Sequence, residues 1–235
     1  MERAEFLAQF NLYYNNISSN QAPGLDPYEV SVFLTHAQEN VVLGLYNGNN
    51  PASKSFEQTE ELRRYLANLI VDVELEPLTN SSGQLLGVEG SNSYFFSLPD
   101  GTGEDPAVWF ITYESVTVTN SKCGGTSSIE VYPVRQDEYQ KIKKNPFRGA
   151  NDRRALRLDL SDNNVEIVSS MPSMHVTKYY IKYFRKPNPI ILENLEDGLT
   201  IEGKNTATDC ELHEALHKSI LEGAVALAVQ NWNRQ

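Results

Sequence analysis

The chain has 235 residues, of which 40% are hydrophobic and 22% charged, a composition that excludes global disorder and supplies the core of one large or two small domains. The formal net charge of −11 argues against a protein whose whole surface binds nucleic acid. The two cysteines, Cys123 and Cys210, lie far apart, exclude a cysteine-rich zinc site and are expected to be reduced thiols. Because neither a signal peptide nor about 18 consecutive apolar residues occurs, we expect a soluble protein that contacts no membrane.

The stretch LDPYEVSVFLTHAQENVVLGLYNG carries the clearest helix signals in the sequence. Asp26 has the position of an N-cap, Pro27 the first helical position, and Glu29 completes a capping box. Asn47-Gly48 marks the end of the helix. One apolar stripe is expected to contain Val30, Leu34, Ala37, Val41 and Leu45, while Gln38, Glu39 and Asn40 face elsewhere.

Two further helices are expected, one on each side of this helix in the sequence. The preceding stretch has Phe6 and Phe10 at helical spacing, followed by Tyr13 or Tyr14. The following stretch starts with a second capping box, formed by Ser55 and Gln58. Its apolar positions are Leu62, Leu66 and Leu69.

The middle of the chain is predicted to be rich in strands. At Val71 the apolar period changes to two, which indicates a strand with one face exposed to water. A helix at Asp137–Lys144 and the exposed basic loop KNPFRGANDRR interrupt the strands that follow, up to about residue 204. The candidate strands after Val71 are NSYFFSL, VWFITYESVTVT, IEVYPV, ALRLDL, VEIVS, KYYIKYF and PIIL.

The last helix is expected to begin near Thr208 or Asp209, where Thr208 and Glu211 form a possible capping box. It runs close to Trp232, and its small and apolar residues favour close packing against the N-terminal helices. These elements together predict an α+β fold. Residues 1–70 form the N-terminal part of a helical bundle, residues 71–206 a large β-rich insertion, and residues 207–235 the helix that completes the bundle.

An H-E-x-x-H motif occurs in CELHEALHKSIL, where it is formed by His213, Glu214 and His217. Two histidines one helical turn apart can bind one zinc ion while the glutamate activates a bound water. A zinc hydrolase also needs a third ligand, and the only acid that follows, Glu222, lies on another side of the helix, while His175 lies in strand-like sequence. No G-x-G-x-x-G, G-x-S-x-G or C-x-x-C motif is present. We therefore interpret the motif as structural and predict no catalytic residue, no bound metal and no cofactor.

Positive charge is concentrated in KIKKNPFRGANDRRALR, residues 141–157, which holds seven of the 20 lysines and arginines. This segment is either a solvated loop or a surface that meets an acidic neighbour. In KYYIKYFRK, residues 178–186, aromatic and basic side chains alternate, a pattern that can bind single-stranded nucleic acid but is more typical of a sheet edge or subunit interface. The candidate partner-interface residues are Lys141, Lys143, Lys144, Arg148, Arg153, Arg154, Tyr180 and Lys182.

Three segments resemble head-to-tail connector proteins of tailed bacteriophages, particularly those of crAss-like phages. LDPYEVSVFLTHAQENVVLGLY is similar to their D-P-x-E-x-x-x-F-L-x-x-A-Q helix near the N-terminus. YYIKYFRKPNPIIL is similar to their strand-Lys-Pro-strand segment, and CELHEALHKSILEGAVALAVQNW to their closing helix, in which a histidine precedes an isoleucine and an alanine-rich run. In such a protein the H-E-x-x-H belongs to a packing motif.

The resemblance implies a structural virion protein, assembled in the host cytoplasm, whose copies form a ring in the connector or tail channel. Such rings are commonly twelvefold, dock beneath the portal protein beside other ring or tail proteins, and surround the channel through which DNA passes. The acidic net charge fits a channel wall that does not hold DNA tightly. Two alternatives stay open: a zinc metallohydrolase that uses residues 213–217, and a tail-fibre or carbohydrate-binding module.

Overall fold

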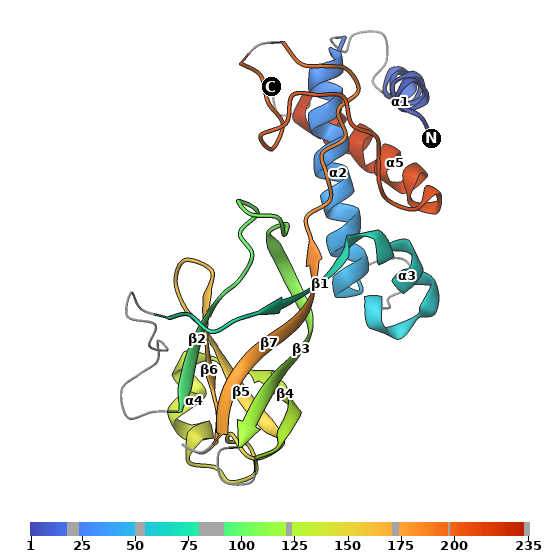
Figure 1. The fold of residues 1–235 in the computed structure, drawn as a ribbon. Coiled ribbons are helices and arrows are strands. Elements are labelled where there is room, and N and C mark those ends of the chain that lie inside the picture. The colour runs from blue at the N-terminus through green and yellow to red at the C-terminus, as the bar shows by residue number, and fades with distance from the viewer. Residues whose placement is uncertain are drawn as a thin grey trace. The chain divides into compact units, whose positions relative to one another are not determined.

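The computed structural model describes residues 1–17, 24–49, 55–79, 92–120, 124–170, 174–196 and 198–232 (Figure 1). The chain divides into two compact units, a helical unit of residues 1–69 with 187–235 and a sheet unit of residues 70–186. The predicted α+β class is confirmed, with helices from both ends of the chain packed together and a sheet between them in sequence. The division places residues 187–206 with the helices, whereas the predicted insertion extended to residue 206. Within the described ranges, no helix is long and apolar enough to cross a membrane.

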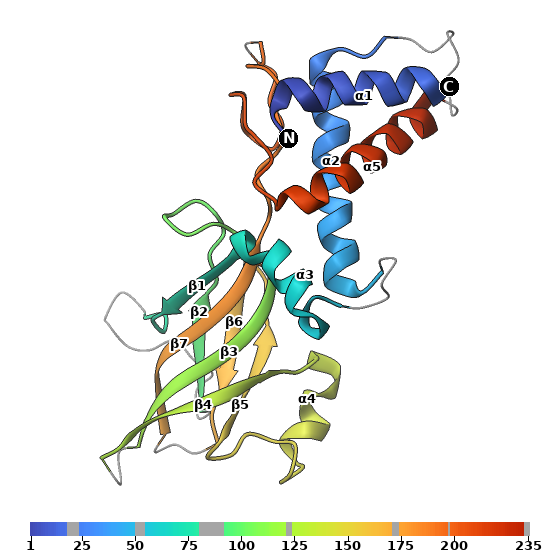
Figure 2. The same cartoon turned by 90° about the vertical axis from the view of Figure 1, so that its right-hand side faces the viewer.

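The helical unit is organised around one long helix, α2, whose ends are those that the sequence predicts. Asp26 Oδ1 accepts a hydrogen bond from Glu29 N at 2.8 Å, and the Glu29 carboxylate accepts one from Asp26 N at 3.1 Å. Gly48 ends the helix in the left-handed conformation, with φ of 76°. Helix α5 crosses and packs against α2, and α1 packs against α5 (Figure 2). The elements of this unit are α1 (Arg3–Ile17), α2 (Pro27–Asn47), η2 (Phe56–Gln58), α3 (Glu60–Tyr65), η3 (Ala67–Leu69) and α5 (Glu214–Trp232).

Helix α2 buries a stripe of three polar side chains, one of which was predicted to face away from the core. Gln38 was expected to face away from the core, but its side chain is fully buried and donates to the Asn188 carbonyl at 2.8 Å. Thr35 Oγ1 accepts from Ile190 N at 3.1 Å, and Ser31 Oγ accepts from Leu192 N at 3.0 Å. These three side chains satisfy main-chain groups of an extended segment that lies against the helix.

That extended segment corrects the predicted strand PIIL, residues 189–192. It belongs to no strand of the sheet, and Ile191 forms only an isolated antiparallel bridge with Thr208. Its isoleucines are fully buried against the helical unit, so the apolar run reflects burial, while α2 hydroxyl groups replace the partners that a sheet would supply. A buried extended segment and a buried strand therefore have the same sequence pattern.

The last helix also begins later than predicted, at Glu214, because both expected capping residues are used elsewhere. Thr208 pairs with Ile191, and its hydroxyl donates to the Pro189 carbonyl at 2.6 Å. The Glu211 carboxylate accepts hydrogen bonds from Asn188 N at 2.6 Å and from Asn188 Nδ2 at 3.1 Å. Contacts with residues 188–191, which are distant in sequence, therefore keep residues 208–211 from starting the helix.

The predicted third helix is divided into short pieces. The Gln58 side chain accepts from Ser55 N at 3.0 Å, as expected of the capping box, but this box begins the single turn η2. Thr59 then caps α3 by accepting from Leu62 N at 3.4 Å. The apolar positions remain as predicted, since Leu62, Leu66 and Leu69 are all buried.

The sheet unit contains one seven-stranded sheet in the order β1-β7-β3-β4-β5-β6-β2. Neighbouring strands are antiparallel except β4 and β5, which are parallel and joined through a connection that contains α4. The elements are β1 (Ile70–Leu75), β2 (Ser93–Ser97), β3 (Val108–Asn120), β4 (Thr126–Pro133), α4 (Gln136–Lys143), β5 (Arg154–Asp159), β6 (Asn164–Val168) and β7 (Met174–Arg185).

The sheet curls so that its concave face encloses the core. Phe96 of β2 and Tyr179 of β7 have ring centroids 5.3 Å apart, although four strands separate β2 from β7 in the sheet order. The Tyr94 hydroxyl likewise lies 3.0 Å from His175 Nδ1. Helix α4 covers a smaller apolar cluster on β5 and β6, made of Leu156, Leu158 and Val168 with Val134, Tyr139, Ile142 and Ala150.

Candidate functional site

The two histidines of the H-E-x-x-H sequence have separate structural surroundings. His213 precedes α5, where its Nδ1 accepts from Ala215 N at 3.2 Å and its ring lies 4.9 Å from that of Tyr65. His217 is only 5% exposed, and its ring lies 5.4 Å from that of Phe6. Because His213 lies ahead of the helix, the two imidazoles do not form the i, i+4 pair on one helical face that a zinc site requires.

Hydrogen bonds also define the charge state of His217. Its Nε2 donates to the Leu212 carbonyl at 3.0 Å, so Nδ1 is left to accept from the Met1 amine at 2.7 Å. Burial lowers the pKa of His217, and the positive Met1 amine acts in the same direction. Glu214 lies in the first turn of α5 and completes no ligand set: among the described residues, no group of three or more His, Cys, Asp or Glu side chains could hold a metal ion.

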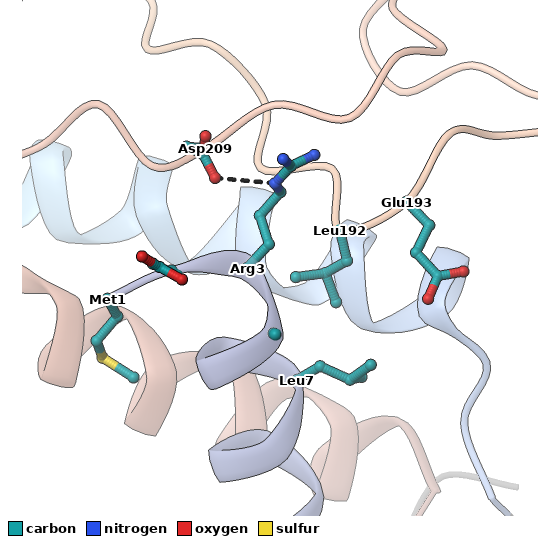
Figure 3. Close-up of a pocket in the computed structure, with 8 residues that line it drawn as sticks. Met1, Arg3, Leu7, Leu192, Glu193 and Asp209 are labelled. Carbon is teal, nitrogen blue, oxygen red and sulfur yellow. Dashed lines mark ion pairs between the residues drawn. The ribbon is translucent and has the colours of Figure 1, made fainter.

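Beside this histidine, the helical unit carries an open hollow of about 680 Å³, which we call the N-terminal hollow (Figure 3). Leu7 of α1 and Leu192 of the extended segment supply apolar surface, and Leu192 is buried. Arg3 Nε forms an ion pair with Asp209 Oδ1 at 2.9 Å. The hollow is lined by Met1, Glu2, Arg3, Ala4, Leu7, Leu192, Glu193 and Asp209, so its charged groups are three carboxylates, the Arg3 guanidinium and the Met1 amine.

The predicted basic residues lie together on the sheet unit, around α4 and the loop that follows it. Lys141 and Lys143 are in α4, and Lys144 is its C-cap. Arg148 and Arg153 lie in the connection to β5, and all five side chains are exposed. Most of the predicted partner-interface residues are therefore exposed along one stretch of the sheet unit, from α4 to the start of β5, which we call the basic surface.

Arg154, at the start of β5, links this basic surface to two aromatic residues that the sequence analysis did not select. Its guanidinium lies 4.2 Å from the centre of the Tyr132 ring, and one of its nitrogens donates to the Phe147 carbonyl at 3.1 Å. Phe147 is 84% exposed and Tyr132 is 41% exposed. We call Tyr132, Phe147, Arg148 and Arg154 the Phe147 patch. The available sequence signal was an apolar residue in an otherwise polar loop, next to Arg148.

Tyr180 and Lys182, the other predicted interface residues, lie on β7 and form a separate patch, which we call the Tyr180 patch. The Tyr180 hydroxyl donates to Asp72 at 3.4 Å, and its ring lies 6.1 Å from that of Tyr113 in an edge contact. Lys182 Nζ lies 6.0 Å from the centre of the Tyr180 ring. Strands β3 and β4 separate β7 from β5 in the sheet, so this patch is distinct from the basic surface.

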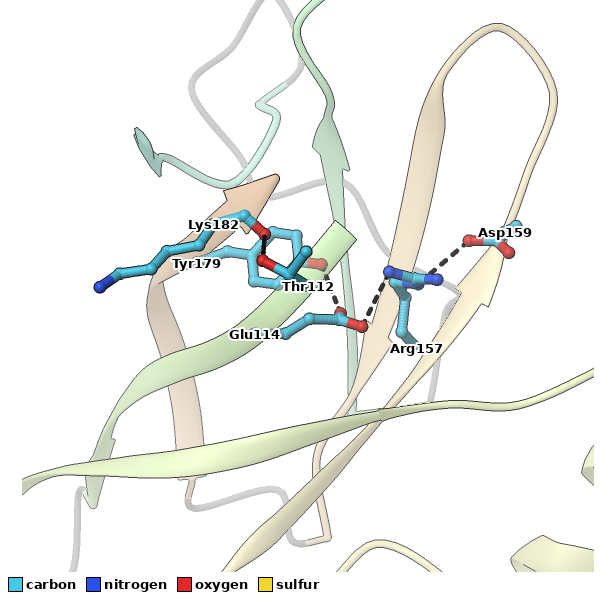
Figure 4. Close-up of polar contacts among 6 residues, drawn as sticks. All are labelled: Thr112, Glu114, Arg157, Asp159, Tyr179 and Lys182. Atoms are coloured by element: carbon cyan, nitrogen blue, oxygen red, sulfur yellow. Dashed lines mark hydrogen bonds and ion pairs between the residues drawn. The ribbon is translucent and has the colours of Figure 1, made fainter. Parts of the chain in front are cut away.

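One basic residue of the segment, Arg157, points into the protein instead of to solvent (Figure 4). It forms an ion pair of 2.9 Å with Glu114, which also accepts from the Tyr179 hydroxyl at 2.6 Å. Arg157 Nε lies 3.0 Å from Asp159 Oδ1, an ion pair without the alignment of a hydrogen bond. Burial raises the pKa of Glu114 against the lowering effect of Arg157, and burial with the Glu114 carboxylate raises the pKa of Tyr179. This trio is a buried polar network, inaccessible to a partner.

Comparison with known proteins identifies the family. Residues 1–235 match the family described as phage tail ring protein 3/4. The chain belongs to this family. It is similar to Ring protein 3 of Bacteroides phage crAss001, with 42% identity over 232 residues, which cover 97% of this chain and 95% of that protein. It is also 30% identical to Ring protein 4/5 of the same phage, over 95% of this chain and 90% of that protein.

The resemblance to crAss-like phage ring proteins, inferred from three segments, is therefore confirmed over the whole chain. A phage tail ring protein is a structural subunit of the virion and resides in its tail region. For such a subunit, surfaces that contact other proteins are the functional sites. The Phe147 patch, the Tyr180 patch and the N-terminal hollow are the candidates for these contacts, and the Glu114–Arg157–Tyr179 trio lies buried in the sheet that carries two of them.

Proposed function

We propose that copies of this chain form a closed ring around the channel of the connector or tail, stacked with the portal protein and other ring or tail proteins. The match of the whole chain to the tail ring family carries this proposal. The resemblance of the three segments to connector proteins supports a twelvefold ring. A ring of identical subunits joins two different surfaces of neighbouring copies, and the chain has exposed aromatic and charged patches of this kind.

Electron cryomicroscopy of the parent particle, with protein identification by mass spectrometry, tests the proposal directly. We expect density for this chain as a symmetric ring on the tail axis, in a position next to another ring or the portal protein. Recovery of the chain only as an unattached monomer, or only from tail fibres, would contradict it. A ring with a symmetry other than twelvefold would change the copy number and leave the role intact.

We further propose that DNA passes through this ring without being held. Each lysine or arginine that contacts a phosphate adds salt-dependent affinity, which would slow the movement of a genome. The net charge of −11 favours weak contact, and the basic surface of α4 and its loop would then meet an acidic neighbouring protein. The chain would thus act through protein contacts alone, without catalysis, metal or cofactor.

Charge reversal of Lys143, Lys144 and Arg153 separates protein docking from DNA binding. All three side chains are exposed, and Arg154 is kept because it contacts Phe147 and Tyr132. We expect the variant to enter particles poorly, while the DNA affinity of both free proteins stays near background at physiological salt. Tight duplex binding by the wild type, lost on reversal, would contradict passage without binding.

Elemental analysis of the purified protein tests the proposed absence of a metal. About one zinc per chain, lost in the variant His217→Ala, would contradict it.

A further inference from the structure

We infer that the Phe147 patch of one copy docks into the N-terminal hollow of a second copy, and that this contact joins neighbouring subunits of the ring. The inference rests on the proposed ring and adds the two surfaces that meet. One surface is on the sheet unit and the other on the helical unit, and the contact is heterologous when each copy uses its patch on one neighbour and its hollow on the other. A heterologous contact that repeats and closes generates a ring.

Phe147 is presented by a loop whose main chain is fixed. The Asn145 side chain accepts hydrogen bonds from Phe147 N at 2.9 Å and from Arg148 N at 3.3 Å. Arg154 donates to the Phe147 carbonyl at 3.1 Å, so the backbone is held on both sides while the ring lies in solvent. A loop whose main chain is fixed in this way loses little conformational entropy when its side chain binds.

The composition of the patch is that of an energetic centre of a protein interface. The Arg154 guanidinium lies 4.2 Å from the centre of the Tyr132 ring and also donates to the Phe147 carbonyl. Aromatic residues and arginine dominate such centres, because they bury a large area and offer directed hydrogen bonds. A partner that covers Phe147 would remove a large exposed apolar side chain from water.

The charges of the two units select a second copy as the partner. Residues 1–69 and 187–235 contain 16 acidic and 7 basic side chains, whereas residues 141–157 contain seven basic side chains and one acid, Asp152. The basic segment of one copy is therefore attracted to the helical unit of another. Complementary charges of this kind orient two proteins before contact and suppress other arrangements.

Within the helical unit, the N-terminal hollow offers both apolar surface and carboxylates to the patch. Leu7 and Leu192 supply apolar surface for the Phe147 ring, and Glu193 is exposed on the rim, within reach of an incoming arginine such as Arg148 (Figure 3). Asp209 is already paired with Arg3. A second groove, of about 270 Å³ between α2 and α5, is lined by Ala37, Asn40, Val41, Gly44, Leu45, Asn49, Leu216, Ser219 and Gly223. That groove has no charged lining residue, so it does not match a basic patch.

Photo-crosslinking inside particles tests the contact. The variant Phe147→p-benzoylphenylalanine, supplied during infection, is expected to crosslink to a second copy within residues 1–7 or 192–193. The matched control is Leu160→p-benzoylphenylalanine, at a position 36% exposed on the same unit, which should not crosslink there. A crosslink to a different virion protein, or to the groove between α2 and α5, would overturn the inference and leave the proposed ring standing. If the wild-type chain were absent from particles, both the proposed ring and the proposed contact would be contradicted.

A charge exchange provides a second, independent test. Arg148→Glu and Glu193→Arg are each expected to lower incorporation into particles about tenfold, and the double variant to restore it, because the exchanged pair attracts again. Both side chains are exposed, so folding is preserved. Glu196→Arg makes the same charge change three residues away and is expected to have little effect. A double variant no better than the single variants, with the wild-type ring intact, would overturn the pairing while leaving the ring function.

Discussion

The helical unit and the sheet unit bury polar side chains in different ways. In the helical unit, neutral groups on one face of α2 satisfy the main chain of residues 188–192, as Ser31 and Thr35 do for Leu192 and Ile190. In the sheet unit, an ion pair is enclosed by the curled sheet, with the Glu114 and Arg157 side chains only 8% and 11% exposed. Removal of a neutral partner leaves one unsatisfied group, whereas removal of one ion leaves a buried charge, which is far more costly.

The units also differ in how the chain forms them. The sheet unit is one continuous segment, and its core is made by residues 70–186 alone. The helical unit needs both ends of the chain, since α5 and residues 187–213 pack on α1 and α2. We therefore propose that the sheet unit folds as an independent domain, while the helices depend on a contact between distant segments.

Truncation gives the largest expected effect. A fragment of residues 70–186 is expected to fold, with a cooperative thermal transition and dispersed amide signals in NMR. A fragment of residues 1–186 should retain that sheet but lose the packing of α1 and α2, because their apolar faces would have no cover. Amide hydrogen exchange measures both outcomes residue by residue. An unfolded 70–186 fragment would contradict the proposed independence.

Removal of one charge from the sheet unit should have the next largest effect. Arg157→Ala leaves Glu114 buried without its cation, so the free energy of unfolding of this unit should fall by about 3–5 kcal/mol. The double variant Glu114→Gln with Arg157→Met keeps an acceptor for Tyr179 and removes both charges, and should recover most of the loss. Arg135→Ala, at an exposed ion pair with Asp137, is the control and should cost at most about 1 kcal/mol. Equal losses for Arg157→Ala and Arg135→Ala in urea unfolding would contradict the buried-charge argument.

A neutral deletion in the helical unit should cost less. Ser31→Ala removes the acceptor for Leu192 N, and one unsatisfied buried N–H should lower the free energy of unfolding by about 1–3 kcal/mol. Hydrogen exchange at the Leu192 amide should accelerate more than exchange in the sheet. Ser219→Ala makes the same chemical change at an exposed helical position and should stay within about 0.5 kcal/mol. Unchanged exchange at Leu192 would show that the hydroxyl is not its partner.

These contrasts explain how much of the fold the sequence predicts. The ends of α2 were predicted because Asp26, Glu29 and Gly48 act through neighbours three or four residues away. The start of α5 was not predicted correctly, because the two expected capping residues form other hydrogen bonds. Thr208 pairs with Ile191 and donates to the Pro189 carbonyl, and Glu211 accepts from Asn188. Local chemistry is visible in a sequence, whereas competition from a distant partner is not.

The candidate site follows the same rule. The basic surface was predicted because its charges are adjacent in the sequence, and the structure keeps most of them exposed together. The Phe147 patch was missed because Tyr132 contacts Arg154 only through the parallel pairing of β4 and β5. Arg157 belongs to the same basic run but is buried with Glu114, a partner 43 residues away. Nothing in the spacing of the run distinguishes it from its exposed neighbours.

The smallest expected effect is a pH dependence in the helical unit. Burial lowers the pKa of His217 below its ordinary value of 6.5, so the native state holds this imidazole neutral. As the pH falls below 6.5, His217 of the unfolded chain binds a proton before His217 of the folded chain does. Protonation therefore favours the unfolded state, and the folded state loses stability until the pH reaches the lower pKa of the native imidazole. The free energy of unfolding should therefore decrease as the pH falls below about 6.5, and the decrease should be small because a single group is responsible. His217→Gln keeps a donor for the Leu212 carbonyl and should show a shallower slope, whereas the exposed His213→Gln serves as the control and should keep the wild-type slope.

Urea unfolding at several pH values, followed by hydrogen exchange in α1 and α5, measures the difference. A wild-type slope in His217→Gln would show that the acid sensitivity arises elsewhere, and a slope of opposite sign would show that the folded state prefers the charged imidazole.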